Sequence, residues 1–91
     1  MRTTADILLV EDEPAIQELL AFNIAQCGFR AIKAHDGASA FAHINRALPD
    51  LILLDWMLPG SSGIELARKL RADQRTRDIP IIMLTARTDE R

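Results

Sequence analysis

Short unbroken runs of hydrophobic residues alternate along the chain with longer stretches in which hydrophobic and polar positions mix. The runs cover residues 7–10, 51–54 and 79–84, and a weaker one covers 29–34. Turn formers or charged residues bound each run. Hydrophobic runs of this length are typical of strands that are buried on both faces of a sheet. We therefore predict four strands at these positions.

The stretches between the runs have the three-to-four-residue spacing of amphipathic helices. Pro14 suits the first turn of one helix, and Gly28 suits its end. Asp36, followed by a glycine, is a cap signal for the second helix, and Ser62 with Glu65 has the spacing of a capping box for the third. The positions that follow the helical spacing are Ile16, Leu19, Leu20, Asn23, Ile24 and Cys27, then Ala40, Phe41, Ile44 and Leu48, then Ile64, Ala67, Leu70 and Arg71.

Strands and helices thus alternate along the whole chain, which ends on the fourth strand and a polar tail. Alternation of this kind predicts right-handed βαβ units and an α/β fold, with a parallel sheet covered by helices. The 91 residues, of which 48% are hydrophobic, are enough for one small domain with a real core.

Composition excludes several classes of protein. The net charge is -2, whereas domains that bind nucleic acid carry a strongly basic surface. The single cysteine, Cys27, excludes an internal disulfide, fits a reducing compartment and is predicted to face the core. No hydrophobic run has the length of a membrane span, and the N-terminus lacks the hydrophobic core of a signal peptide. We expect a soluble, cytoplasmic protein with no membrane partner.

Candidate chemistry lies where three of the predicted strands end. Glu11 and Asp12 follow the first strand, Asp55 the third and Thr85 the fourth. The carboxyl ends of parallel strands meet at one edge of a sheet, about 4.8 Å from strand to strand. Carboxylates gathered there suit Mg²⁺, and a carboxylate beside the ion is a known phosphoryl nucleophile. The hydroxyl of Thr85 can donate to a bound phosphoryl oxygen.

Each of these residues also has an ordinary structural interpretation. An acid after a strand is more often a cap or a solvated loop charge, and Glu13 fits only a role at a helix N-terminus. Trp56, next to Asp55, is interpreted as a half-buried loop aromatic. The case for a functional site rests on the coincidence of these acids and Thr85 at the same end of three strands.

Three motifs carry a resemblance to a known family. They are Val-Glu-Asp-Glu-Pro at 10–14, Pro-Asp-Leu-Ile-Leu-Leu-Asp-Trp-Met-Leu-Pro-Gly at 49–60 and Ile-Pro-Ile-Ile-Met-Leu-Thr-Ala-Arg at 79–87. They resemble the receiver domain of two-component response regulators, most of all the phosphate-regulon branch, whose members carry a winged-helix DNA-binding domain. The resemblance implies the flavodoxin-like doubly wound sheet, for which the strand order 2-1-3-4-5 is known.

The resemblance also implies roles for individual residues. Asp55 resembles the phosphoacceptor that takes a phosphoryl group from a sensor histidine kinase. Glu11 and Asp12 resemble the acidic pair that holds Mg²⁺, together with Asp55 and the backbone carbonyl of Met57. Thr85 resembles the switch residue that contacts the phosphoryl group, and Ala86 the small residue that leaves room for it.

Part of the family pattern is missing from residues 1–91. The resemblance predicts a fifth strand, a fifth helix and a lysine after that strand, and neither Lys33 nor Lys69 lies in the matching element. We expect a receiver domain that is incomplete at its C-terminus, without the DNA-binding domain through which relatives contact DNA. The fourth strand, exposed at the sheet edge, is predicted to support self-association.

The leading functional prediction is therefore a phosphoacceptor signalling domain, not an enzyme, that uses Mg²⁺, assists its own phosphorylation and dephosphorylation, and controls transcription through an attached output. Two alternatives stay open. One is a phosphorylation-independent interaction fragment, favoured by the missing lysine. The other is a Mg²⁺-dependent aspartyl-phosphate phosphatase, against which Met57 counts because such enzymes place a second Asp there.

Overall fold

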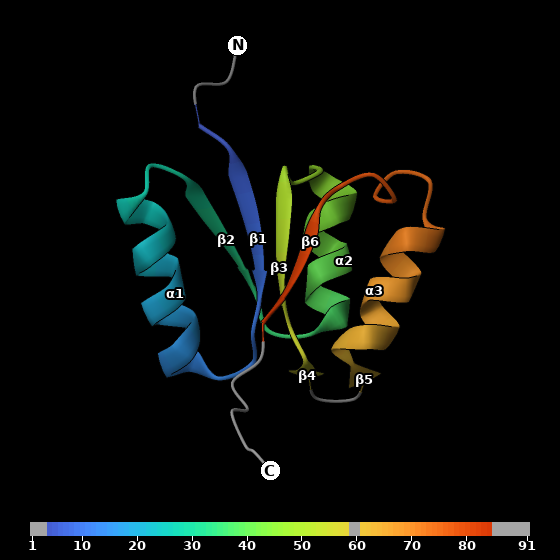
Figure 1. Cartoon of the computed structure of the whole chain (residues 1–91), viewed down its shortest axis with the longest axis horizontal. Helices are drawn as coiled ribbons and strands as arrows, with labels where there is room; N and C mark the ends of the chain where they lie inside the picture. Colours follow the sequence, from blue (N-terminus) through green and yellow to red (C-terminus); the bar gives the residue numbers. More distant parts are fainter. Residues whose placement is uncertain (1–3, 59–60, 85–91) are drawn as a thin grey trace.

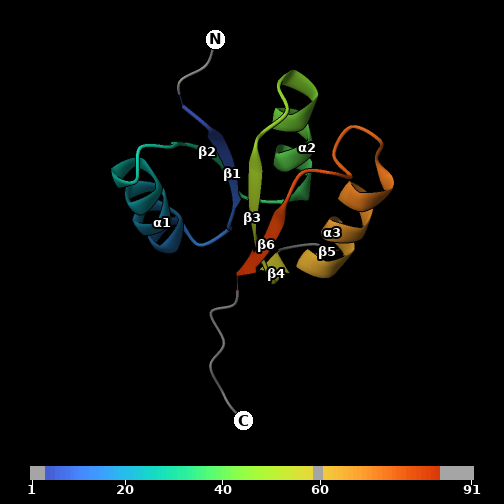
Figure 2. The same cartoon turned by 45° about the horizontal axis from the view of Figure 1, so that its top comes forward.

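The computed structural model describes residues 4–58 and 61–84, with only the backbone described at Met57 and Ser61. Its main sheet has four parallel strands in the order β2-β1-β3-β6. Figures 1 and 2 show α1 covering one face of this sheet and α2 and α3 the other. The elements are β1 (Asp6–Val10), α1 (Pro14–Gln26), β2 (Arg30–Ala34), α2 (Gly37–Arg46), β3 (Leu51–Asp55), β4 (Met57–Leu58), β5 (Ser61–Ser62), α3 (Gly63–Ala72) and β6 (Ile81–Leu84).

This arrangement confirms the predicted doubly wound α/β fold. Each of the four hydrophobic runs forms a strand, and all pair in parallel. The first strand lies between the second and the third, as in the flavodoxin-like order. Because β1 and β3 are the two inner strands, residues that follow them lie side by side at the centre of one sheet edge.

Burial explains why the strand sequences are continuously hydrophobic. Successive side chains of a strand point to opposite faces. In β1, Leu8 and Val10 belong to the core beneath α2 and α3, whereas Ile7 and Leu9 belong to the core beneath α1. All four are buried, so from Ile7 to Val10 neither face of the strand has a polar position.

The predicted core face of α1 is only partly right, since it holds for Leu20 and Ile24 but not for the other positions. The buried residues of this helix are Ala21 and Ile24, with Leu20 packed at the edge of the core. Leu19 is 60% exposed, and Cys27, predicted to face the core, is exposed as well. Hydrophobic residues occupy most sides of this helix, so the helical spacing fits more than one face.

The other two helices follow the predictions more closely. Asp36 caps α2 in a full capping box, and its carboxylate accepts the amide of Ser39 at 2.8 Å. Ser62 caps α3 by accepting the amide of Glu65 at 3.1 Å. Two expected core positions are wrong, because Leu48 and Ile64 are exposed. Leu48 lies beyond the end of α2, and α3 turns Leu66 inward instead of Ile64.

Two further features of the fold were not predicted. β4 and β5 form a small antiparallel pair between Asp55 and α3. The stretch after α3 is polar, yet Thr76 within it is completely buried. Its hydroxyl donates to the carbonyl oxygen of Leu70 at 2.6 Å, which satisfies a backbone acceptor at the end of α3.

Candidate functional site

Glu11 and Asp12 come directly after β1 at the centre of the sheet edge. The amide of Glu11 donates to the carbonyl oxygen of Ala34 at 2.9 Å, which extends the pairing of β1 with β2. The side chain of Gln17, on α1, donates to the carbonyl oxygens of Glu11 and Ala34 at 2.9 and 3.0 Å. Glu11 is only 5% exposed, whereas Asp12 is exposed. The backbone that carries the two acids is therefore fixed by two neighbouring elements.

Gln17 was not singled out by the sequence. It is one polar side chain in the first half of a helix whose other polar residues are solvated, and no short motif marks it. The one sequence feature that could have identified Gln17 is its position six residues after Glu11, near the start of the helix that follows β1.

Asp55 is the last residue of β3 and lies between two strands. Its neighbour Leu54 is in register with Val10 of β1, and Asp55 itself is in register with Leu84 of β6. The amide of Trp56 donates to the carbonyl oxygen of Leu84 at 3.0 Å, so the strand pairing continues past Asp55. The side chain of Asp55 is partly exposed, which leaves it accessible from solvent.

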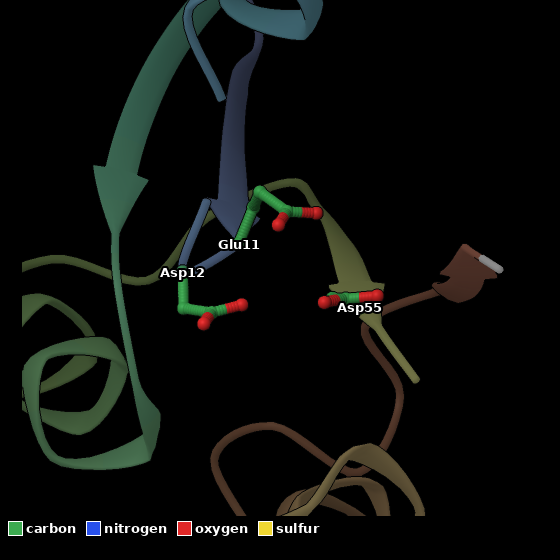
Figure 3. Close-up of side chains that lie close together, drawn as sticks. All are labelled: Glu11, Asp12 and Asp55. Carbon is green, nitrogen blue, oxygen red and sulfur yellow. The ribbon is translucent and has the colours of Figure 1, made fainter. Parts of the chain in front are cut away.

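The structure brings the three predicted acids together. Each of Glu11, Asp12 and Asp55 offers a carboxylate oxygen, and these oxygens lie within 4.8 Å of one another. Figure 3 shows the three side chains converging from the ends of β1 and β3 on one space. The predicted shared site at the common edge of the sheet thus has the required geometry.

The electrostatics of the cluster favour a cation. Burial raises the pKa of Glu11, and repulsion from the carboxylates of Asp55 and Asp12 raises it further. The amide of Glu13, which donates to the Glu11 carboxylate at 3.0 Å, acts in the opposite direction. A divalent cation between the three carboxylates would compensate both the burial and the repulsion.

The donor set fits Mg²⁺ in particular. This ion takes oxygen ligands at about 2.1 Å, so ligands on opposite sides of it lie about 4.2 Å apart. Neighbouring ligands of the same octahedron lie about 3.0 Å apart, so the three oxygens, which lie within 4.8 Å of one another, would draw closer together around the ion. Met57, whose carbonyl was predicted to join them, lies two residues beyond Asp55 as the first residue of β4. Thr85 and Ala86 lie outside the described residues.

Trp56 matches its interpretation as a half-buried loop aromatic, since it is 46% exposed. Together with Ile64 and Met83 it lines a groove of about 570 Å³ between α3 and β6. It therefore lies beside the acidic cluster but contributes to a different surface.

Comparison with known families decides the class of protein. A model described as the response regulator receiver domain matches residues 7–91. The chain belongs to this family. Receiver domains are signalling domains that bind Mg²⁺ at an acidic site and are phosphorylated by sensor histidine kinases.

Individual relatives agree with this assignment. The phosphate regulon transcriptional regulatory protein PhoB of Escherichia coli is 52% identical over 84 residues, which cover 92% of this chain and 37% of PhoB. The chain therefore spans well under half the length of this relative and matches only its receiver part.

Solved structures agree as well. A putative response regulator from Chloroflexus aurantiacus superposes with a TM-score of 0.90 at 32% identity, covering 96% of this chain and 71% of that one. The response regulator TrrA of Thermotoga maritima, solved in complex with Mg(2+)-BeF, has a TM-score of 0.85 at 36% identity, covering 93% of this chain and 72% of that one.

One negative finding concerns membranes. Among the described residues, none of the helices combines the length and the hydrophobicity that crossing a bilayer requires.

Proposed function

We propose that this receiver domain accepts a phosphoryl group on Asp55 from a phosphohistidine of a sensor histidine kinase. Glu11, Asp12 and Asp55, with the carbonyl oxygen of Met57, hold the Mg²⁺ that the transfer requires. The observation that carries the proposal is the convergence of three carboxylates, with oxygens within 4.8 Å, at the ends of two adjacent parallel strands.

The chemistry follows from the position of each side chain. A carboxylate oxygen of Asp55 attacks phosphorus in line with the leaving imidazole. The new P–O bond forms as the P–N bond breaks, and the electron pair leaves with the imidazole nitrogen. Mg²⁺ supplies positive charge that stabilises the transferring phosphoryl oxygens. The partial exposure of Asp55 lets a donor as large as a kinase domain reach it.

Glu11 and Asp12 do different work because they differ in burial. The exposed Asp12 can contact the ion directly from the solvent side. The buried Glu11, held by the amide of Glu13, is fixed in orientation and would contribute negative charge to a bound ion. Positioning and electrostatics of this kind account for most of the catalysis in phosphoryl transfer.

Phosphorylation biases a two-state surface instead of forming a released product. The proposal includes Thr85 as the residue that contacts the phosphoryl group and Ala86 as the small residue beside it. It also includes a role for the domain in its own phosphorylation and dephosphorylation, which makes it a signalling domain and not a metabolic enzyme.

For the whole protein we propose a cytoplasmic regulator in which residues 1–91 belong to the receiver domain and an effector domain contacts DNA to control transcription. The name of the E. coli relative, a transcriptional regulatory protein, supports this output. Self-association through β6 is proposed as a second interaction, because in the described part of the chain this strand pairs on one side only.

The experiment is incubation with acetyl phosphate and Mg²⁺, followed by intact mass and by release of inorganic phosphate. We expect one stable phosphoryl adduct on the wild-type chain, none on Asp55→Ala, and none when EDTA removes the metal. Glu13→Gln is the matched control, because Glu13 adjoins the site but does not belong to the cluster. It should be labelled like the wild type.

The two alternatives give different results in the same experiment. A phosphatase would release phosphate in many turnovers without accumulating an adduct. A phosphorylation-independent interaction module would show neither an adduct nor phosphate release, which would overturn the proposed function.

A further inference from the structure

Gly63, the first residue of α3, lies directly against the backbone that carries Asp55. A Cβ atom built on Gly63 would lie 2.2 Å from the carbonyl oxygen of Asp55 and 2.9 Å from that of Trp56. Real Cβ atoms essentially never approach other atoms within 3.0 Å, and both neighbours here are backbone atoms. The amide of Gly63 also donates to the carbonyl oxygen of Trp56 at 2.7 Å. Only glycine fits this position without a displacement.

The strand side of this contact is the C-terminal end of β3. Asp55 ends an inner strand that pairs with β1 and β6, and the amide of Trp56 is bonded to Leu84 of β6. A shift of the Asp55 carbonyl would disturb the pairing of β3 with β6.

The helix side is the part that is fixed. Leu66 and Leu70 anchor α3 in the core beneath the sheet, where both are buried. Ser62 caps the first turn of the helix. A side chain at position 63 therefore has to be accommodated by the segment from Asp55 to Met57, which must widen a 2.2 Å contact to at least the 3.0 Å that real Cβ atoms keep.

We propose that Gly63 is a positioning residue of the Mg²⁺ site, an inference that rests on the proposed function. Its missing side chain and its amide fix the carbonyls of Asp55 and Trp56. They thereby set the direction of the Asp55 carboxylate and the place of the Met57 carbonyl. Mg²⁺ demands near-ideal octahedral geometry, so ligands that move relative to one another bind it weakly.

The other two acids cannot follow such a movement. Glu11 and Asp12 come from β1, and the amide of Glu11 is bonded to Ala34 of β2. A side chain at position 63 shifts Asp55 while Glu11 and Asp12 stay in place, so the cluster loses its mutual geometry.

Gly28 provides the matched control. It has a φ of +91°, which disfavours any side chain, but a Cβ atom there would meet nothing within 4 Å. It precedes β2, whose first residue is in register with Asp6, and so lies at the opposite edge of the sheet from Asp55. Gly28→Ala destabilises the fold without touching the acidic cluster.

The experiment is a titration of the wild-type chain, Gly63→Ala and Gly28→Ala with MgCl₂, followed by the fluorescence of Trp56, the only tryptophan. Circular dichroism establishes that each variant is folded. We expect Gly63→Ala to bind Mg²⁺ at least about tenfold more weakly than the wild type, since losing a contact that orients metal ligands typically costs about 10- to 100-fold in metal affinity. Gly28→Ala should keep the wild-type affinity.

The outcomes separate this inference from the proposed function. If the wild type responds to Mg²⁺ and Gly63→Ala binds it equally well, the inference alone is wrong. Equal losses of affinity in both glycine variants would also overturn it, since they would reflect general instability. If the wild type does not respond to Mg²⁺, the proposed function fails and this inference fails with it.

A second measurement covers the case in which Gly63→Ala does not fold. The three proteins are then titrated in trimethylamine N-oxide, which favours the folded state. In addition, amide hydrogen exchange is measured on the wild type. Slow exchange of the Gly63 amide supports its bond to Trp56, whereas exchange as fast as that of an exposed loop would overturn the inference.

Discussion

At the scale of single residues, the buried carboxylate of Glu11 is the most unusual feature of the molecule. It is nearly inaccessible to solvent, it lies beside the carboxylates of Asp12 and Asp55, and burial raises its pKa. A buried charge without a countercharge destabilises a folded protein. Glu11 is therefore expected to weaken the metal-free fold and to contribute to stability only when a cation is bound.

Glu11→Gln tests this expectation at about pH 7. Glutamine keeps the shape and can still accept the amide of Glu13, but it carries no charge. In EDTA the variant should be at least as stable as the wild type in urea unfolding. With Mg²⁺ at 100 times the wild-type Kd, the wild type should gain about 2.7 kcal/mol, whereas a tenfold loss of affinity limits the variant to about 1.4 kcal/mol.

Glu13→Gln is the control for this prediction and should gain as much as the wild type. A Glu11→Gln variant that is less stable than the wild type in EDTA, and yet gains the full amount from Mg²⁺, would contradict this role of Glu11.

At the scale of elements, the N-terminal cap of α2 should make the stability of the fold depend on pH. The amide of Ser39 donates to the Asp36 carboxylate and lowers the pKa of Asp36 below 3.8, and the Ser39 hydroxyl and His35 act in the same direction. Since the folded pKa is lower than the unfolded one, the cap contributes stability fully above pH 3.8. That contribution is lost as the pH falls through the folded pKa.

Asp36→Asn and Asp36→Ala together test this cap by thermal melts between about pH 7 and pH 3. Asp36→Ala should lower Tm by several degrees at neutral pH, and the difference from the wild type should shrink as the pH falls. Asp36→Asn retains a capping oxygen without a titrating charge, so its own contribution should not vary with pH. An Asp36→Ala deficit that stays constant down to the lowest pH would show that the charged cap does not form.

The elements also show what the sequence could predict and where it failed. The strands were predictable because continuous hydrophobic runs arise when both faces are buried, as in β1 and β3. The rotation of α1 was not predictable, because hydrophobic residues on most of its sides fit several faces. The burial of Thr76 and the close approach of Gly63 depend on contacts between distant segments, and local pattern does not record them.

At the scale of the whole molecule, the candidate site was predictable because the order and direction of the strands determine which residues meet. Parallel strands place their carboxyl ends at one edge, so acids that follow β1 and β3 meet there once the order is known. The supporting contacts were not predictable. Gln17 over the end of β1 and the β4–β5 pair after Asp55 become visible only in three dimensions.

The two outer strands of the sheet differ in how well their edges are protected against pairing with another strand. β2 carries Arg30 and Lys33, and charged side chains protect an edge. β6 consists of Ile81, Ile82, Met83 and Leu84, and Ile82 is 49% exposed. In the described residues no strand pairs with the outer side of β6. This asymmetry within the described residues is the basis of the proposed self-association through β6.

Sedimentation velocity over a range of concentrations tests this proposal. The wild-type chain should associate as its concentration rises, and Ile82→Lys should weaken the association by adding a charge at the edge. Ile16→Lys is the matched control, since Ile16 is also partly exposed but lies on α1. A wild type that stays monomeric throughout, or equal effects of the two substitutions, would count against pairing through β6.

The account as a whole depends on one cation held between Glu11, Asp12 and Asp55. The most direct measurement is anomalous diffraction from crystals of the chain grown with Mn²⁺ as a substitute for Mg²⁺. We predict a single anomalous peak in the space enclosed by the three carboxylates, bonded to oxygens of Asp12 and Asp55. Density for the ion elsewhere, or three carboxylates turned to separate regions of solvent with no ion between them, would contradict the account.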